Sequence, residues 1–263
     1  MDNRSDGLRV VYKGKTYNLS TRLRPPLDNL VVFLHGWGGA KECFDGAFSY
    51  DALEGYGMCA IDLLGFGKSD QPAGFSYDLL DQANIAALAV NSFKAKKVYL
   101  VGHSMGGGIG TLAAPLITNL AIFIDADSNL APSGSGTGAR LLSKQPFWLF
   151  KFFTLPLIKI LLWLHPKRPM RVWAKWFSEA SPLGLHRSIQ SLVEWSDGGE
   201  LLPRFRALRQ KAYIYGEKGK RRKDVVPELD KSIVYEVPKS GHALMNDNPA
   251  AFYDVIAKII GTT

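Results

Sequence analysis

The chain has 263 residues, of which 46% are hydrophobic and 21% are charged, and its formal net charge is +8. These values are ordinary for a globular protein, and the length suffices for one large α/β domain with an insertion. The two cysteines are too few for a disulfide scaffold, and neither has the His or Cys neighbours of a metal site. The polar N-terminus lacks the apolar stretch of a secretory signal, so we expect a cytoplasmic protein that needs no cofactor or metal.

Short apolar runs of strand length alternate with helical patterns along most of the chain. The first two, Leu8–Tyr12 and Thr16–Leu19, predict a hairpin that turns at Lys13–Gly14. Helices are expected at about 44–54, 77–93, 104–116 and 249–260. Six further strands are predicted at Leu30–Leu34, Met58–Leu63, Val98–Val101, Leu120–Ile124, Ala212–Tyr215 and Ile233–Val237. Such alternation is typical of a parallel sheet with helices on both faces, which the leading hairpin makes mixed.

The alternation breaks between about residues 131 and 203, where an aromatic stretch reads "PFWLFKFFTLPLIKILLWLHPKRPMRVWAKWF". Lys151, Pro156 and Lys159 interrupt its most apolar part, which disfavours a helix that spans a membrane. We expect a helical cap over the carboxyl edge of the sheet instead, with peripheral membrane contact as a second interpretation. The predicted domains are a core over 1–130 and 204–263 and a cap over 131–203.

Most of the positive charge falls in this insertion. Between Ala131 and Arg204, ten Lys or Arg residues stand against four acidic residues, which accounts for +6 of the net charge. No nucleic-acid motif accompanies the charge, so we expect no nucleic-acid partner. A basic face toward anionic lipid or an anionic substrate fits better, and a solvated basic surface without a partner is the alternative.

A serine lies between glycines just after the apolar run Val98–Val101. Residues Gly102 to Gly106 read G-x-S-x-G between a predicted strand and a predicted helix. So sharp a turn strains the backbone of the serine, and the glycines two residues before and after it avoid clashes. The Ser104 hydroxyl would then lie at a helix N-terminus, which favours a developing anion. Ser104 is therefore the candidate nucleophile, with a glycine-rich turn and a capping serine as the alternative.

Two other segments supply the partners that such a serine needs. The turn "HGWGG" after the strand Leu30–Leu34 can present the Trp37 amide toward the serine, beside the Met105 amide, as an oxyanion hole. Of the five histidines, His242 follows the last predicted strand, so its loop lies at the same sheet edge as Ser104. We expect His242 to be the general base.

These segments resemble a known superfamily. "LHGWGG", "DLLGFGKSD", "GHSMGG" and "SGHALMNDNPAAF" are similar, in this order, to motifs of α/β-hydrolases of the esterase-like group with a helical lid. The resemblance covers nearly the whole chain except the lid. It implies a mostly parallel eight-stranded sheet and a Ser–acid–His triad. The serine argues against close relatives with an aspartate nucleophile, such as haloalkane dehalogenases and epoxide hydrolases.

The acid of the triad is the open point. The family commonly places it after the seventh strand in a pattern like G-x-x-D, but here Gly219 stands at the aspartate position. Asp127 is the favoured replacement, because "DSNLAP" resembles an E-G-N-L-A-P segment in which some members place the acid. A triad is defined by geometry and not by chain order, so such a change is allowed. Asp224, Asp125 and Glu217 are the alternatives.

The expected activity is that of a cofactor-free serine hydrolase. It would cleave carboxylic esters of hydrophobic, small to medium substrates through an acyl-enzyme, since the insertion is rich in Phe, Trp and Leu. The alternatives are a hydrolase-like ligand receptor, or a lipase, lactonase, acyltransferase or C–C bond hydrolase that uses the same triad. The fold alone cannot separate these.

Overall fold

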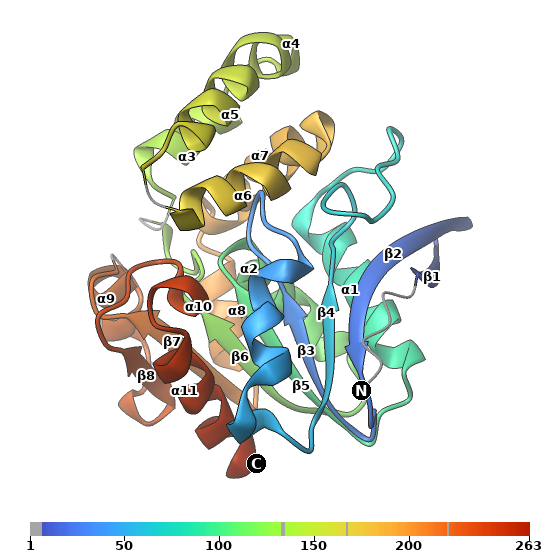
Figure 1. Ribbon diagram of the computed structural model, residues 1–263, viewed down its shortest axis with the longest axis vertical. Coiled ribbons are helices and arrows are strands. Elements are labelled where there is room, and N and C mark those ends of the chain that lie inside the picture. Colours follow the sequence, from blue (N-terminus) through green and yellow to red (C-terminus); the bar gives the residue numbers. More distant parts are fainter. Residues whose placement is uncertain (1–6, 133–134, 167, 220) are drawn as a thin grey trace.

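The computed structural model describes residues 7–132, 135–166, 168–219 and 221–263, and an eight-stranded sheet forms its centre (Figure 1). The strand order is β1-β2-β4-β3-β5-β6-β7-β8. The hairpin of β1 (Gly7–Tyr12) and β2 (Lys15–Arg24) joins β4 (Gly57–Ile61) in antiparallel pairing, and every later pair is parallel. The mostly parallel eight-stranded sheet predicted from the sequence is therefore confirmed.

The central strands are apolar along most of their length because helices cover both faces of the sheet. In β3 (Asn29–Leu34), Leu30, Val32 and Leu34 join one hydrophobic core, and Val31 and Phe33 join the other. This is the two-residue period of a strand with both faces buried. The other strands of the parallel part are β5 (Lys97–His103), β6 (Leu120–Ala126), β7 (Lys211–Gly216) and the edge strand β8 (Val234–Val237).

Helices on the two faces come from different parts of the chain. The first core includes α1 (Leu79–Ser92) and α2 (Met105–Ala113), and the second includes α11 (Pro249–Gly261). Short helices complete the layers: η3 (Ala114–Leu116), α9 (Arg221–Asp224), η6 (Val226–Glu228), η7 (Lys231–Ile233) and α10 (Leu244–Asp247).

The prediction of one helix over 44–54 is wrong in the type of helix. The segment forms two 3₁₀ helices, η1 (Lys41–Ser49) and η2 (Asp51–Leu53). Lys41, Phe44, Ala47 and Phe48 of η1 are buried, and the backbone of Phe44 is not helical, with a φ of −108° and a ψ of 16°. This bend at Phe44 interrupts a continuous α-helix.

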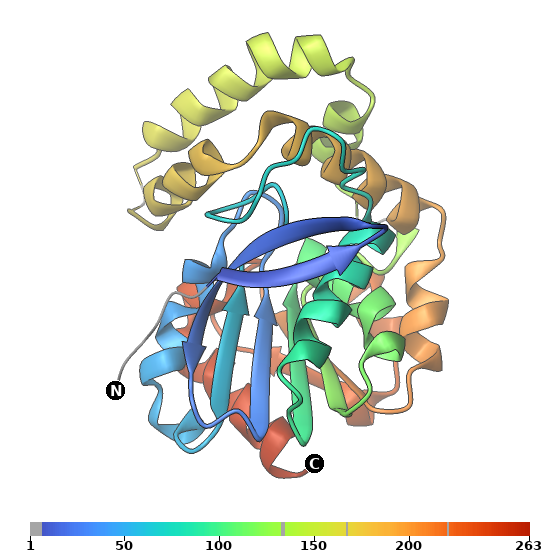
Figure 2. The same ribbon diagram turned by 90° about the vertical axis from the view of Figure 1, so that its right-hand side faces the viewer.

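Further helices lie above the carboxyl edge of the sheet (Figures 1 and 2). They are α3 (Thr137–Ser143), α4 (Phe147–Leu149), the π-helical turn η5 (Phe150–Thr154), α5 (Leu155–Trp163), α6 (Arg168–Glu179) and α7 (Pro182–Asp197). The figures place α4 and α5 outermost, with α6 and α7 between them and the sheet. The next helix, α8 (Leu201–Ala207), packs against α2 and contains the predicted boundary between residues 203 and 204.

Among the described residues, no single helix has the length and apolar character needed to cross a membrane. By length and composition alone, one pair would pass together: α3 and the segment Phe147–Trp163, which are bent by 116° relative to each other.

Candidate active site

Ser104 occupies a strained turn between β5 and α2. Its φ is 54° and its ψ is −117°, a conformation that costs a non-glycine residue on the order of 1–3 kcal/mol. A Cβ atom on Gly102 would lie 2.3 Å from the Gly106 carbonyl oxygen, and one on Gly106 would lie 2.3 Å from the Leu34 carbonyl oxygen. Both glycines of G-x-S-x-G are therefore required by the close approach of neighbouring backbone.

The structure brings Ser104, His242 and Asp127 together. His242 Nε2 lies 2.9 Å from Ser104 Oγ, and His242 Nδ1 lies 2.6 Å from Asp127 Oδ2. The Asp127 side chain is 2% exposed, whereas that of His242 is 49% exposed. Because His242 Nδ1–H donates a hydrogen bond to the carboxylate, Nε2 is left as an acceptor for the serine hydroxyl.

The end of β6 holds Asp127 in a fixed position. Its φ is 57°, in the left-handed region that aspartate tolerates better than most residues, and its N–H donates to the Ile214 carbonyl at 2.8 Å. The Ala126 carbonyl accepts from the Ser104 N–H at 3.0 Å, which ties the end of β6 to the serine turn. Asp127 Oδ1 is buried and has no hydrogen-bond partner among the described residues. Gly219, the glycine at the expected acid position, faces the Asp127 carboxylate. A Cβ atom on Gly219 would lie 3.4 Å from Asp127 Oδ1.

The structure also places the three alternative acids. Asp125 is buried, and its carboxylate accepts from the N–H and the hydroxyl of Ser128. Glu217 accepts from the Lys239 N–H at 2.7 Å. Asp224 ends the short helix α9. His242 Nδ1 donates its hydrogen bond to Asp127.

A buried histidine orients the peptide that carries the Trp37 N–H. His35 Nε2 accepts from the Leu63 N–H at 3.1 Å, so its Nδ1 carries the proton and donates to the Gly36 carbonyl at 2.8 Å. The Gly39 N–H donates to the same carbonyl at 3.0 Å. This carbonyl and the Trp37 N–H belong to one planar peptide unit, so these hydrogen bonds fix the direction of the Trp37 N–H. Met105 is the first residue of α2, where an N–H has no acceptor within the helix.

The Trp37 side chain connects this turn to the helices above the sheet. Its Nε1 donates to the Leu185 carbonyl at 2.8 Å, and its ring meets Phe177 edge-on at 5.1 Å. Gly38 has a φ of 70°, and a Cβ atom there would lie 2.2 Å from the Phe177 ring. The turn therefore needs a glycine at Gly38 because α6 packs directly on it.

The motif "DLLGFGKSD" supports the same turn from below. The buried Asp62 carboxylate accepts from the Lys41 N–H at 2.7 Å, from Lys41 Nζ at 2.8 Å and from the Lys68 N–H at 2.9 Å. A Cβ atom on Gly67 would collide with this carboxylate at 2.3 Å. Since breaking a buried ion pair leaves an uncompensated charge, Asp62 and Lys41 are structural supports of the site.

Sequence reasoning missed one neighbour of the general base candidate. The neighbour is His103, which lies within the serine turn and whose Nε2 lies 2.8 Å from the His242 carbonyl oxygen. A carbonyl only accepts, so Nε2 of His103 carries the proton. The two imidazole rings lie 4.9 Å apart. His103 thus positions the loop of His242, and its place beside the serine in the motif was the available signal.

Burial of His35 leads to a pH-dependent stability. Desolvation lowers the pKa of His35 below its ordinary value of 6.5. As the pH falls below 6.5, the His35 imidazole binds a proton in the unfolded chain but stays neutral in the folded protein. The free energy of unfolding should therefore fall by up to about 1.4 kcal/mol per pH unit. Urea unfolding between pH 5 and pH 8 measures this slope. In a His35→Gln variant the slope should be shallower by this contribution, and equal slopes would contradict the assignment.

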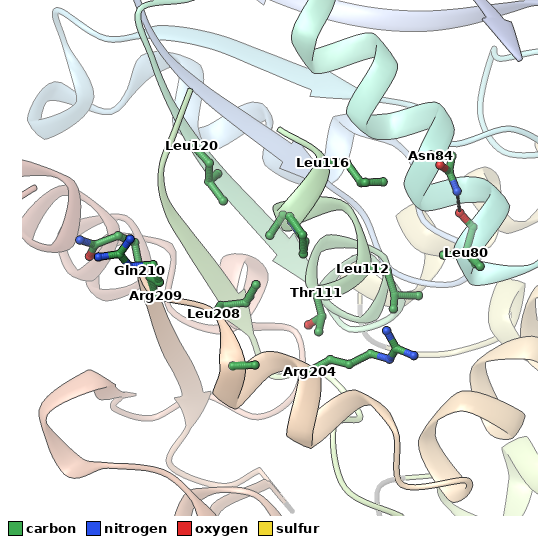
Figure 3. Close-up of a pocket in the computed structure, with 13 residues that line it drawn as sticks. Leu80, Asn84, Thr111, Leu112, Leu116, Leu120, Arg204, Leu208, Arg209 and Gln210 are labelled. Carbon is green, nitrogen blue, oxygen red and sulfur yellow. Dashed lines mark hydrogen bonds between the residues drawn. The ribbon is translucent and has the colours of Figure 1, made fainter. Parts of the chain in front are cut away.

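A groove of about 900 Å³ lies away from the serine turn (Figure 3). It is lined by Thr111 and Leu112 near the end of α2, by Leu120 at the start of β6 and by Arg204 of α8. Ser104 precedes the other end of α2, so this groove belongs to the opposite edge of the sheet. Within the described residues, no group of three or more His, Cys, Asp or Glu side chains is placed to hold a metal ion.

Comparison with known proteins assigns the chain to a family. Residues 31–255 match the model of the alpha/beta hydrolase family. The chain belongs to this family. The superfamily resemblance seen in the sequence is thereby confirmed, and family membership supports hydrolysis as the class of reaction.

Individual relatives of this alpha/beta hydrolase are distant. A probable lysophospholipase of Arabidopsis thaliana, BODYGUARD 4, is 27% identical over 56% of this chain. The matched region covers only 36% of the length of that relative. The 2-succinyl-6-hydroxy-2,4-cyclohexadiene-1-carboxylate synthase of Shigella flexneri is 24% identical over 88% of this chain and 93% of its own. The structure of an esterase from Exiguobacterium antarcticum superimposes with a TM-score of 0.75 at 20% identity, over 98% of this chain and all of that one. At this identity the superposition shows the fold alone.

Proposed function

We propose that this alpha/beta hydrolase cleaves carboxylic esters of small to medium hydrophobic acyl or aryl groups through a covalent acyl-enzyme. The continuous hydrogen-bonded chain from Ser104 Oγ through His242 to Asp127 carries the proposal. In the first step Ser104 Oγ attacks the ester carbonyl carbon while His242 Nε2 accepts the hydroxyl proton. Asp127 holds the imidazole in the required tautomer and stabilises the imidazolium.

The tetrahedral intermediate places a negative charge on the former carbonyl oxygen. The N–H groups of Trp37 and Met105 are the proposed donors to this oxygen. Collapse of the intermediate expels the alcohol, which takes the proton from His242. A water molecule then attacks the acyl-enzyme, His242 takes one of its protons, and the carboxylic acid leaves as Ser104 regains its hydrogen.

A hydrophobic substrate is supported by the aromatic side chains above the turn that carries Trp37. Phe177 contacts Trp37 at 5.1 Å and Trp173 at 5.5 Å between ring centroids. The similarity to a probable lysophospholipase of Arabidopsis thaliana is consistent with ester hydrolysis. A lipase, lactonase, acyltransferase or C–C bond hydrolase would use the same three side chains, and a ligand receptor could retain them.

A panel of p-nitrophenyl esters of increasing acyl length, together with a fluorophosphonate label, tests the proposal. We expect turnover with an optimum at short to medium acyl chains, and one phosphonyl group per chain on the peptide that contains Ser104. Lysophosphatidylcholine and a homoserine lactone belong in the same panel, because preferred turnover of either would assign the substrate to that class instead. A chain that turns over none of these compounds and takes no label would overturn the enzyme proposal, and a ligand-induced rise in Tm would then favour a receptor.

A further inference from the structure

The outermost helical layer of the molecule presents a row of large apolar side chains to solvent. Eight such side chains on the segment from α4 to the residue after α5 are between 55% and 70% exposed. We call them the outer cap face: Trp148, Phe152, Phe153, Leu157, Ile160, Leu161, Trp163 and Leu164. Figures 1 and 2 show this segment farthest from the sheet.

Packing within the chain does not account for this face. The opposite side of the same segment already supplies buried residues, namely Phe150, Leu155 and Leu162, to the main hydrophobic core. A surface helix normally turns polar residues outward, and a monomeric protein rarely exposes so many contiguous apolar side chains without a binding role. The outer cap face therefore needs a partner outside the chain.

The surrounding charge is positive. Residues 131–180 include eight Lys or Arg and one acidic residue, Glu179, and one of the eight, Arg140, forms an ion pair with Asp197 of α7. Lys144 and Lys151 are exposed, and Lys151 Nζ lies 5.1 Å from the centre of the Phe152 ring, at the edge of the outer cap face. On α6, which packs beside α5, Arg171 and Lys175 are exposed as well.

The combination of exposed apolar side chains and positive charge distinguishes between possible partners. A second copy of the chain on the same face would bring two sets of basic residues together, which is unfavourable. An anionic lipid surface complements both properties, because its headgroups attract the basic side chains and its acyl boundary takes up the apolar ones. Trp148 and Trp163, near the two ends of the segment, are of the residue type that favours the membrane–water interface.

We propose that the outer cap face docks onto the surface of an anionic lipid bilayer. The segment Phe147–Trp163 would lie in the plane of the interface, consistent with the finding that no single described helix could cross a membrane. The core of the protein then stands on the side away from the lipid (Figure 2). This proposal concerns binding and does not depend on the chemistry proposed for Ser104.

Sedimentation with lipid vesicles tests the proposal in the full chain. We expect the protein to pellet with vesicles of phosphatidylcholine containing phosphatidylserine, and much less with phosphatidylcholine alone. A Lys144→Gln/Lys151→Gln variant should bind the anionic vesicles about 30-fold more weakly, because each basic residue near such a surface contributes about fivefold. Lys231→Gln/Lys258→Gln is the matched control, since it removes the same charge from exposed positions of the core and should bind as the wild type does.

The apolar contribution has its own variants. Phe152→Ser/Trp163→Ser should lose at least tenfold in binding to the anionic vesicles, whereas Val11→Ser/Leu88→Ser, which removes exposed apolar side chains of the core, should not. Unchanged circular dichroism and Tm show that each variant is folded. The proposal is overturned if the wild type does not pellet, if the cap and core variants bind equally, or if size-exclusion chromatography shows a dimer that Phe152→Ser/Trp163→Ser abolishes without any lipid binding.

Discussion

Replacing Ser104 with alanine is expected to lower kcat for ester hydrolysis by on the order of 10⁶-fold, to the level of the background reaction on the protein surface. The reason is that Ser104 Oγ is the atom hydrogen-bonded to His242 at 2.9 Å, and no acyl-enzyme forms without it. Rates with p-nitrophenyl esters and loss of the fluorophosphonate label measure the effect. Ser232→Ala, at an exposed serine of the core, is the control and should keep full activity.

The Ser104→Gly variant distinguishes the loss of the catalytic hydroxyl from a loss of stability. Ser104 has a φ of 54°, which glycine adopts without strain. Ser104→Gly should therefore be as inactive as Ser104→Ala but more stable than the wild type by about 1 kcal/mol in urea unfolding. Substantial turnover by either variant would remove Ser104 from the mechanism.

The strands of the sheet could be predicted from the sequence because each one is marked by a local apolar run. The apolar runs that end before Trp37 and Ser104 lie within two residues of the observed β3 and β5, since buried parallel strands must be continuously apolar. Ser104 and His242 follow directly from where such strands end. The segment of η1 was harder to predict, because its buried residues Phe44, Ala47 and Phe48 have the spacing of an α-helix, whereas the backbone is bent at Phe44.

The local pattern "DSNLAP" favoured Asp127 over the other acids, but the position of Asp127 beside His242 depends on which strands are neighbours. In the structure β6 lies between β5 and β7, and Ala126 pairs with His103. The residue after β6 is therefore next to the residue after β5, and this register is what brings Asp127 to the site. The Asp125 carboxylate, two residues earlier, points instead into the turn of Ser128. The outer cap face could not be predicted either, because an apolar helix in a sequence does not reveal which of its sides the fold covers.

Asp127→Asn is expected to lower kcat by about 10⁴-fold with little change in the fold. An amide in place of the carboxylate cannot stabilise the imidazolium of His242, and it favours the wrong tautomer of the ring. Asp224→Asn and Glu217→Gln are the controls and should retain activity, since Glu217 already accepts from the Lys239 N–H and Asp224 ends α9. Full activity in Asp127→Asn with loss in Asp224→Asn would assign the acid to Asp224.

A transplanted carboxylate tests whether position around His242, and not position in the chain, defines the acid. A Cβ atom on Gly219 would lie 3.4 Å from Asp127 Oδ1, and the φ of Asp127, 57°, suits a glycine. In Asp127→Gly/Gly219→Asp the new carboxylate should reach the space that Asp127 leaves and recover at least 10²-fold of the lost activity. The recovery should be incomplete, because the same Cβ atom would lie 2.9 Å from the Gly216 carbonyl oxygen and the loop must shift. Asp127→Gly alone supplies the baseline, and a double variant no faster than this baseline would show that the loop after β7 cannot carry the acid in this protein.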